Sequence, residues 1–383
     1  MHIPQDIWTK VSSIILWVFL LFTPYSIAIH SICLGLMVLV ICGWYGYNHT
    51  WLQSIRMDAV LTWCLIPIAY LLSLFYTHDF MRGWHQWTNM TPLLILPLFF
   101  KFLIREEEKP KLIIGFAIAC STSVLLHFWA HHGLHLFSWH STSPLTLFYT
   151  ASKNAWIWWS ALVLLILYKR TWLHIILMLI LGIGLMYLGY LSLLISAGIW
   201  YIISDRKRLG AGPNDLWVKL GVFLPTIFLS AWVLFDASHS TLLMWYETGL
   251  SFYTKSNMPL MAEAYFQDAH FSINQWWMHP FNGVGLGDYI HAMWNEYNTH
   301  GLQVPDSPAQ GFLHFAVSCG MIAVVALVMI YKSYNDHHKT ALPLAIFLIL
   351  HFVVFVPLIS TISAAVLLLP ILLSPSFQTE PVT

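Results

Sequence analysis

A histidine and an aspartate in the stretch YNTHGLQVPDS have side chains that can do acid–base chemistry. The imidazole of His300 can take a proton from a hydroxyl group, and the nearby carboxylate of Asp306 can orient the ring. Other bases stay open: His314, His279, or a carboxylate, either Asp306 itself or Asp288. A histidine at the edge of an apolar segment more often has a structural hydrogen-bonding role, so each assignment is a hypothesis.

Three basic residues stand apart from the charged clusters of the chain: Arg82 in MRGWHQW, Lys153 in TASKNAW and Lys255 in YTKSN. A guanidinium group can hold a phosphate with two hydrogen bonds, and an ammonium group supplies a compact positive charge. Such groups stabilise the negative charge that develops when a phosphate-linked group leaves. The plainer alternative is that they anchor the chain at a membrane surface, and we expect that role in particular for Lys255.

Two motifs that could suggest a metal or a nucleotide are better explained otherwise. The cluster HHGLH, which begins at His131, lacks a carboxylate or cysteine partner, so we expect no metal ion and no cofactor. The glycines of HPFNGVGLGDY would bind a nucleotide only between a strand and a helix. We instead predict a turn that ends a surface helix, in which the glycines take positive φ angles.

The composition shows what kind of elements must position these residues. The 383 residues are 58% hydrophobic, 16% aromatic and only 9% charged, as in a polytopic membrane protein. A spanning helix needs about 20 mostly apolar residues, which predicts an all-α fold with about twelve transmembrane helices. We expect these spans near residues 9–26, 28–46, 59–77, 89–104, 111–130, 154–168, 171–185, 187–204, 216–235, 309–331, 341–356 and 358–374.

Basic residues predict the orientation of the spans, because Lys and Arg are retained on the cytoplasmic side. If both termini are cytoplasmic, only Arg82, Lys153 and Lys255 lie outside. The chain then divides into spans one to nine (1–235), a large periplasmic loop (236–308), and spans ten to twelve with a C-terminal tail (309–383). The predicted surface helix in the loop carries Trp276 and Trp277, whose rings suit either headgroup depth or stacking on sugars.

Two runs in the second half of the chain resemble a known family. INQWWMHPFNGVGLGDY, followed by DSPAQGFLHFAVSCGMIAVVALVMIYK, is similar to the signature region of the O-antigen ligase and polymerase family. In that family a Pro and Gly-x-Gly turn lies in a large periplasmic loop, and a His with a polar neighbour opens the next membrane helix. The matching positions here are Pro280, Gly283, Gly285, Gly287, Gln310, Phe312, Leu313 and Gly320.

The chain differs from the family at positions where the family usually has the His and Arg residues expected to take part in catalysis. Ala309 stands where the family usually has its His. Ser196, Ala197 and Gly198 stand where it often has Ser-Arg-Gly, and Glu263 where the loop helix often has Arg. The resemblance therefore implies the arrangement of helices and loop. The catalytic base remains one of the candidates His300, His314, His279, Asp306 and Asp288.

The resemblance implies a membrane glycosyltransferase of the bacterial inner membrane. Its donor would be a glycan linked to a polyprenyl diphosphate such as undecaprenyl diphosphate, transferred with inversion and without a metal ion. The expected acceptor is lipid A-core, as for an O-antigen ligase in lipopolysaccharide biosynthesis. An O-antigen polymerase and a protein O-oligosaccharyltransferase are alternatives within the family. The expected partners are the donor, the acceptor and the lipid bilayer, and no nucleic acid.

Within this interpretation His300 and Asp306 are expected to be catalytic. Substrate binding is expected from Arg82, Lys153, Gln310, His314, Trp276 and Trp277. A polysaccharide-lipid transporter without chemistry is a further alternative, but such proteins tend to show repeated halves and charges at mid-membrane. This chain has no clear internal repeat, and almost all its charges fall in predicted loops.

Overall fold

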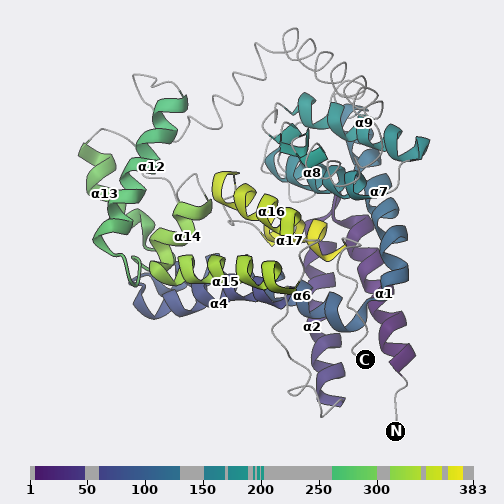
Figure 1. Cartoon of the computed structure of the whole chain (residues 1–383), viewed down its shortest axis with the longest axis horizontal. Helices are drawn as coiled ribbons and strands as arrows, with labels where there is room; N and C mark the ends of the chain where they lie inside the picture. Colours follow the sequence, from purple (N-terminus) through teal and green to yellow (C-terminus); the bar gives the residue numbers. More distant parts are fainter. Residues whose placement is uncertain are drawn as a thin grey trace. The chain divides into compact units, whose positions relative to one another are not determined.

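The computed structural model describes residues 5–47, 60–129, 151–168, 171–188, 193–194, 196–198, 200–201, 261–299, 311–337, 342–355 and 361–373. All regular secondary structure within these residues is helical, which confirms the predicted all-α class (Figure 1). The chain forms two compact units. Unit 1 comprises Met1–Arg56, Leu98–Ser238 and Val366–Thr383, and unit 2 comprises Met57–Pro97 and His239–Ala365. Two of the four boundaries between the units fall within α6 (Pro92–Leu103) and α17 (Thr361–Leu372).

Unit 1 is a set of apolar helices. Its described helices are α1 (Gln5–Phe22), α2 (Ile27–Tyr47), η3 (Glu106–Glu108), α7 (Lys109–Trp129), α8 (Ala151–Leu167) and α9 (Trp172–Tyr187). Helix α7 is central, because it contacts α1, α8 and α9. The Tyr25 hydroxyl, in the turn between α1 and α2, donates to the Ala119 carbonyl at 2.6 Å and ties that turn to α7.

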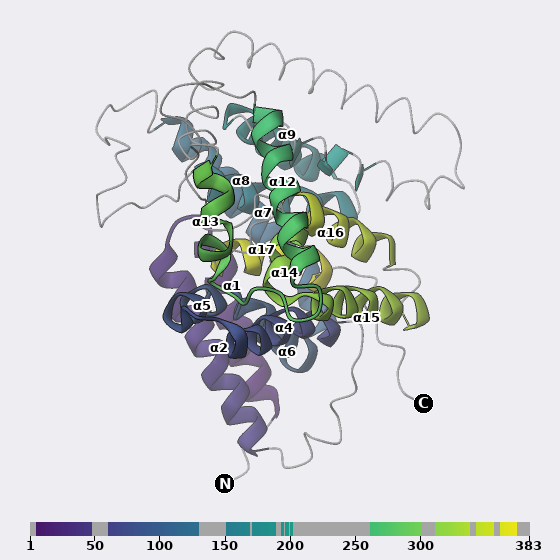
Figure 2. The same ribbon diagram turned by 90° about the vertical axis from the view of Figure 1, so that its left-hand side faces the viewer.

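Unit 2 holds the segments that carry the glycine motif. Its described helices are η1 (Leu61–Cys64), α4 (Leu65–Ser73), η2 (Leu74–Tyr76), α5 (Phe80–Thr88), α12 (Met261–Met278), α13 (Tyr289–Thr299), α14 (Gly311–Cys319), α15 (Met321–His337) and α16 (Leu342–Phe355). Helix α14 contacts α4, α12 and α16, and α15 runs beside α4 (Figures 1 and 2). The buried Trp63 indole donates to the Tyr334 hydroxyl at 2.9 Å, which joins η1 to α15.

The predicted span 309–331 is interrupted where a single helix was expected. Helix α14 ends at Cys319 and α15 begins at Met321, and Gly320 between them has a φ angle of 60°. This left-handed backbone cannot continue an α-helix, and glycine adopts it without a steric penalty. The apolar pattern continues through the break, so hydropathy alone does not reveal it.

Most of the described helices lie within predicted spans, whereas α5, α12 and α13 lie between them, and few have the length of a membrane crossing. Ile27–Gly46 and Glu106–Trp129 are long and apolar enough, while Ile7–Phe22, Leu61–Tyr76, Lys153–Leu167 and Trp172–Tyr187 are apolar but shorter. The predicted span 216–235 and half of 187–204 lie outside the described residues.

Apolar side chains on the outside of unit 1 indicate whether water or lipid surrounds it. Ile14 on α1 is 63% exposed, and Leu39 on α2 is 67% exposed. Large exposed apolar surfaces are rare on soluble monomers, so these helix faces favour membrane association.

Candidate functional site

The glycine motif forms a turn directly after α12. Gly283, Gly285 and Gly287 have φ angles of 69°, 95° and 94°. These values confirm the predicted positive φ angles, which other residues rarely adopt. The turn links the end of α12 to the start of α13, and α12 carries Trp276 and Trp277 as predicted.

The turn satisfies the backbone groups that the break at Gly320 would leave unpaired. The N–H of Val284 donates to the Val317 carbonyl at 2.8 Å, and the N–H of Gly285 donates to the Ser318 carbonyl at 3.2 Å. In return, the N–H of Met321 donates to the Phe281 carbonyl at 3.2 Å. The last carbonyls of a helix and the first N–H groups of the next lack partners within their helices. The turn therefore caps α14 and α15 at once.

The same turn contacts the segment that leads into α5. The Thr77 hydroxyl donates to the Leu286 carbonyl at 2.8 Å. A Cβ atom on Gly287 would lie 2.6 Å from the Gly83 nitrogen, and a Cβ atom on Gly83 would collide with the Leu286 carbonyl oxygen. Glycine is thus required at both positions, Gly83 and Gly287, because the two backbones are in contact where a Cβ atom would lie.

Asp288 fixes the geometry of this contact. Its side chain is buried, and its carboxylate accepts the N–H groups of His78 at 2.6 Å and Asp79 at 3.0 Å. Hydrogen bonds to an ionised acceptor are stronger than neutral ones. Asp79 in turn caps α5, since its Oδ1 atom accepts the N–H of Arg82 at 3.1 Å. One carboxylate therefore holds the residues that begin α5 in place.

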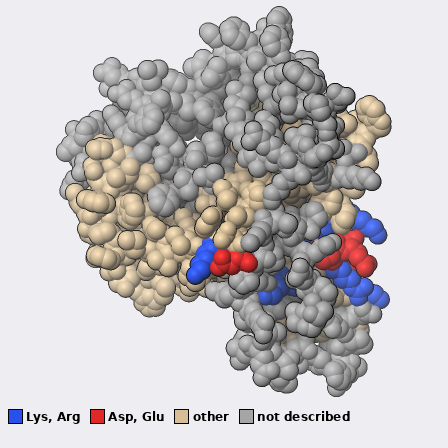
Figure 3. Space-filling view, in the orientation of Figure 1, with Lys and Arg blue, Asp and Glu red and all other residues tan. Residues whose placement is uncertain are grey.

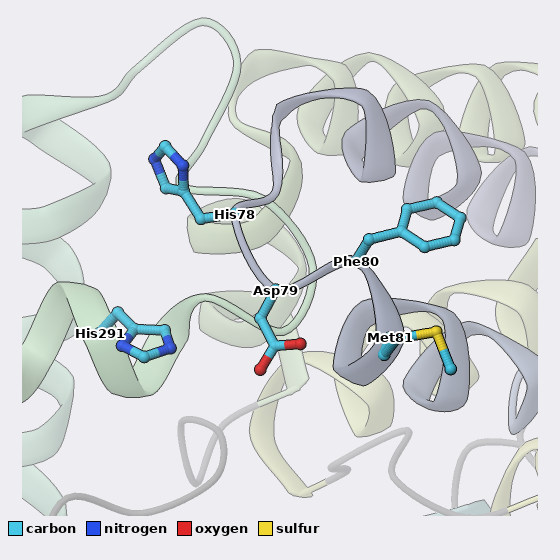
Figure 4. A pocket seen from close by; sticks show the side chains of 5 residues that line it. All are labelled: His78, Asp79, Phe80, Met81 and His291. Atoms are coloured by element: carbon cyan, nitrogen blue, oxygen red, sulfur yellow. The ribbon is translucent and has the colours of Figure 1, made fainter.

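A pocket of about 720 Å³ opens beside this contact, lined by His78, Asp79, Phe80, Met81 and His291. The first four residues precede or begin α5, and His291 lies in the first turn of α13. Figure 4 shows the His291 ring directed from α13 toward the segment that carries His78 and Asp79. The imidazoles of His78 and His291 are solvent-exposed. The pocket thus offers imidazole and carboxylate groups on a backbone held by Asp288.

Aromatic rings continue along α5 from this pocket. Phe80 stacks on Trp84 with ring centroids 6.1 Å apart, and Trp84 stacks on Trp87 at 5.0 Å. The Trp87 indole donates to the Pro67 carbonyl at 2.8 Å, which holds α5 against α4. Phe80 and Trp84 remain exposed, so ring faces are available beside the pocket.

The predicted substrate-binding residues are distributed over both units. In unit 2, Arg82 lies in the first turn of α5, next to the pocket residue Met81. Trp277 is exposed, whereas Trp276 packs against a buried cluster of Phe271, Tyr289, Met293 and Val317. Lys153 is the third residue of α8 in unit 1.

His314 lies in the interior of unit 2. Its side chain is buried on α14, and its Nδ1 atom is 2.7 Å from the Tyr70 hydroxyl. His300, Asp306 and Gln310 lie outside the described residues, as does the HHGLH cluster. Of the alternative bases, Asp288 has its carboxylate engaged by two backbone N–H groups, which is a structural role.

The sequence interpretation did not identify His78, Asp79 and His291 as site residues. Asp79 before the amphipathic run FMRGWHQWT is a recognisable helix-capping residue, but capping alone does not indicate a pocket. The contact with Asp288 joins residues 210 positions apart, and no local pattern reveals such a pairing. Among the described residues, no group of three His, Cys, Asp or Glu side chains could hold a metal ion.

Charged groups are sparse on the described surface. On the face shown in Figure 3, Lys, Arg, Asp and Glu side chains gather in a few small patches, and the other described surface is uncharged.

Sequence comparison identifies no related protein. No protein-family model matches the chain, and no curated protein sequence matches it significantly.

Proposed function

We propose that this chain is a multi-pass glycosyltransferase of the bacterial inner membrane, an O-antigen ligase that moves a glycan from a polyprenyl diphosphate to lipid A-core. The observation that supports this most is the glycine turn, which caps the break between α14 and α15 and holds the start of α5 through Asp288. Asp288 thereby holds the backbone of two pocket residues, His78 and Asp79, and Asp79 caps the helix that carries Arg82.

The proposed reaction is an inverting transfer. The acceptor hydroxyl gives its proton to a base, proposed as His300 oriented by Asp306, and its oxygen forms a bond to the anomeric carbon of the glycan. The bond between that carbon and the diphosphate oxygen breaks, and polyprenyl diphosphate leaves with the electron pair. A cation is proposed to stabilise the leaving diphosphate, and the candidates are Arg82 and Lys153, each considered separately.

The proposed topology has about twelve spans with both termini in the cytoplasm, as hydropathy and the positive-inside rule predict. The apolar exposed faces of α1 and α2 support the membrane location, and the number and orientation of the spans rest on the sequence. In this topology Arg82 and the glycine turn lie on the periplasmic side, where a lipid-linked glycan meets lipid A-core.

Gene deletion tests the function. We expect the deletion strain to lose long glycan chains on lipid A and to retain glycan on the polyprenyl carrier, as seen on a polysaccharide gel and in extracted lipid. Lipid A that carries a single repeat would instead identify a polymerase. Unchanged chains on lipid A would refute both activities.

Alanine variants test the proposed site residues in the complemented strain. His300→Ala, Arg82→Ala and Lys153→Ala are each expected to reduce glycan transfer at equal protein level. The matched control is His270→Ala, because His270 is an exposed histidine on α12 that does not line the pocket. Wild-type transfer by all three variants would refute the assignment.

A further inference from the structure

We infer that the pocket lined by His78, Asp79, Phe80, Met81 and His291 is a saccharide-binding subsite. The inference rests on the proposed glycosyltransferase function and names residues that the sequence interpretation did not assign. The ligand class is a neutral, hydroxyl-rich sugar unit, which either the donor glycan or the acceptor oligosaccharide can supply.

The functional groups of the pocket match the chemistry of a sugar. Sugar hydroxyls both donate and accept hydrogen bonds. The Asp79 carboxylate accepts such bonds, and the imidazoles of His78 and His291 can donate or accept them. The exposed ring of Phe80 offers an apolar face to the C–H groups of a sugar ring. Figure 4 shows Phe80 and Met81 on one side of the segment and His291 on the other.

The same groups disfavour a phosphate ligand. Asp79 lines the pocket, and the buried carboxylate of Asp288 lies directly behind the backbone of His78 and Asp79. Two carboxylates close to a diphosphate would repel it. A neutral sugar meets no such repulsion, so the groups that line this pocket suit a sugar better than a phosphate.

The pocket is also held in one geometry before any ligand arrives. Asp288 holds the backbone of His78 and Asp79, and Tyr289 begins α13 directly after it. The buried Tyr289 hydroxyl lies 2.9 Å from Ser272 Oγ on α12, which fixes the start of α13 and so the position of His291. A fixed site binds more tightly because less freedom is lost on binding. The volume of about 720 Å³ lies within the range typical of small-molecule sites.

Binding measurements on the full-length protein in nanodiscs test the subsite without requiring catalysis. The probes are the oligosaccharide released by mild acid from the bacterium's surface glycan, the core oligosaccharide from its lipopolysaccharide, and inorganic diphosphate. The variants are His291→Ala and Asp79→Asn, since asparagine caps a helix about as well as aspartate. The control is His85→Ala, because His85 is an exposed histidine on α5 outside the pocket.

We expect saturation-transfer NMR to show that the wild type binds at least one oligosaccharide. Each pocket variant should weaken that binding about tenfold, the loss expected for one or two hydrogen bonds, and His85→Ala should not. The oligosaccharide affected identifies the source of the sugar, donor or acceptor. Diphosphate binding should stay unchanged in His291→Ala.

Two outcomes would overturn the subsite. One is that neither oligosaccharide binds or that the pocket variants bind like the wild type. The other is that His291→Ala weakens diphosphate binding and leaves oligosaccharide binding unchanged. The gene deletion decides the proposed function separately: oligosaccharide binding with unchanged glycan chains in the deletion strain retains the subsite and refutes the ligase.

Discussion

Asp288 is the single residue on which the geometry of the candidate site depends most. Its buried carboxylate accepts two backbone N–H groups from the segment before α5, while the neighbouring backbone belongs to the glycine turn. Both N–H groups donate to this one buried side chain, and hydrogen bonds to an ionised acceptor are stronger than neutral ones. The position of His78 and Asp79 in the pocket follows from this contact.

Removal of this carboxylate should destabilise the protein. Asp288→Ala leaves two N–H groups without an acceptor, and we expect it to lower stability by about 2–5 kcal/mol. Asp288→Asn retains one acceptor oxygen and should have a smaller effect. Thermal denaturation of the detergent-solubilised protein measures both, and equal midpoints for Asp288→Ala and the wild type would show that the carboxylate is not needed.

At the residue level, the backbone conformation of the glycine motif could be predicted from the sequence, whereas hydrogen bonds between residues far apart in the chain could not. The positive φ angles of the three motif glycines followed from their spacing in HPFNGVGLGDY. The role of Asp288 did not, because it appeared only as an alternative base. Its partners lie more than 200 positions away in the chain, and a single sequence carries no signal for such a contact.

At the level of elements, the turn acts as a shared cap between helices. It pairs with carbonyls at the end of α14, receives the first N–H of α15 and touches Gly83 of α5. The apolar runs predicted the sequence of α14 and α15 as one span, but they did not predict α5. The break at Gly320 was not predictable, because FLHFAVSCGMIAVV is apolar on both sides of it. The break is stable because the turn satisfies the groups it exposes.

A pair of glycine substitutions tests the close approach of these elements. Gly287→Ala combines a φ angle of 94° with a Cβ atom 2.6 Å from the Gly83 nitrogen, so it should destabilise by at least about 1–3 kcal/mol. Gly35→Ala on α2 meets no atom within 4 Å and should be neutral or slightly stabilising. Denaturation midpoints that fall equally for both variants would contradict the close contact between Gly287 and Gly83.

At the level of the whole molecule, the exposed apolar faces of the helices determine the surroundings the chain needs. Two described stretches, Ile27–Gly46 and Glu106–Trp129, have the length and hydropathy of membrane-crossing helices. The composition predicted membrane spans, whereas the division into two compact units was not foreseen. That division follows from contacts between segments that are distant in sequence, and such contacts cannot be read from hydropathy.

Cell fractionation checks the membrane assignment. We expect the chain to stay in the membrane pellet after alkaline carbonate extraction, because apolar exposed helices bind lipid and not only other proteins. Alkaline phosphatase fused after Met278 should be active, and green fluorescent protein fused at the C-terminus should fluoresce. Release by carbonate would contradict integration into the membrane, and the reverse pattern of fusion activities would contradict the orientation.

The contact between Asp288 and the start of α5 also sets an order of events during synthesis. His78 and Asp79 leave the ribosome about 210 residues before the carboxylate that binds them. At typical rates of translation, this interval is roughly 10–40 s. During that time α5 has its amphipathic aromatic face but not its final anchor. A nascent chain stalled before Asp288 therefore lacks the contact that holds the start of α5.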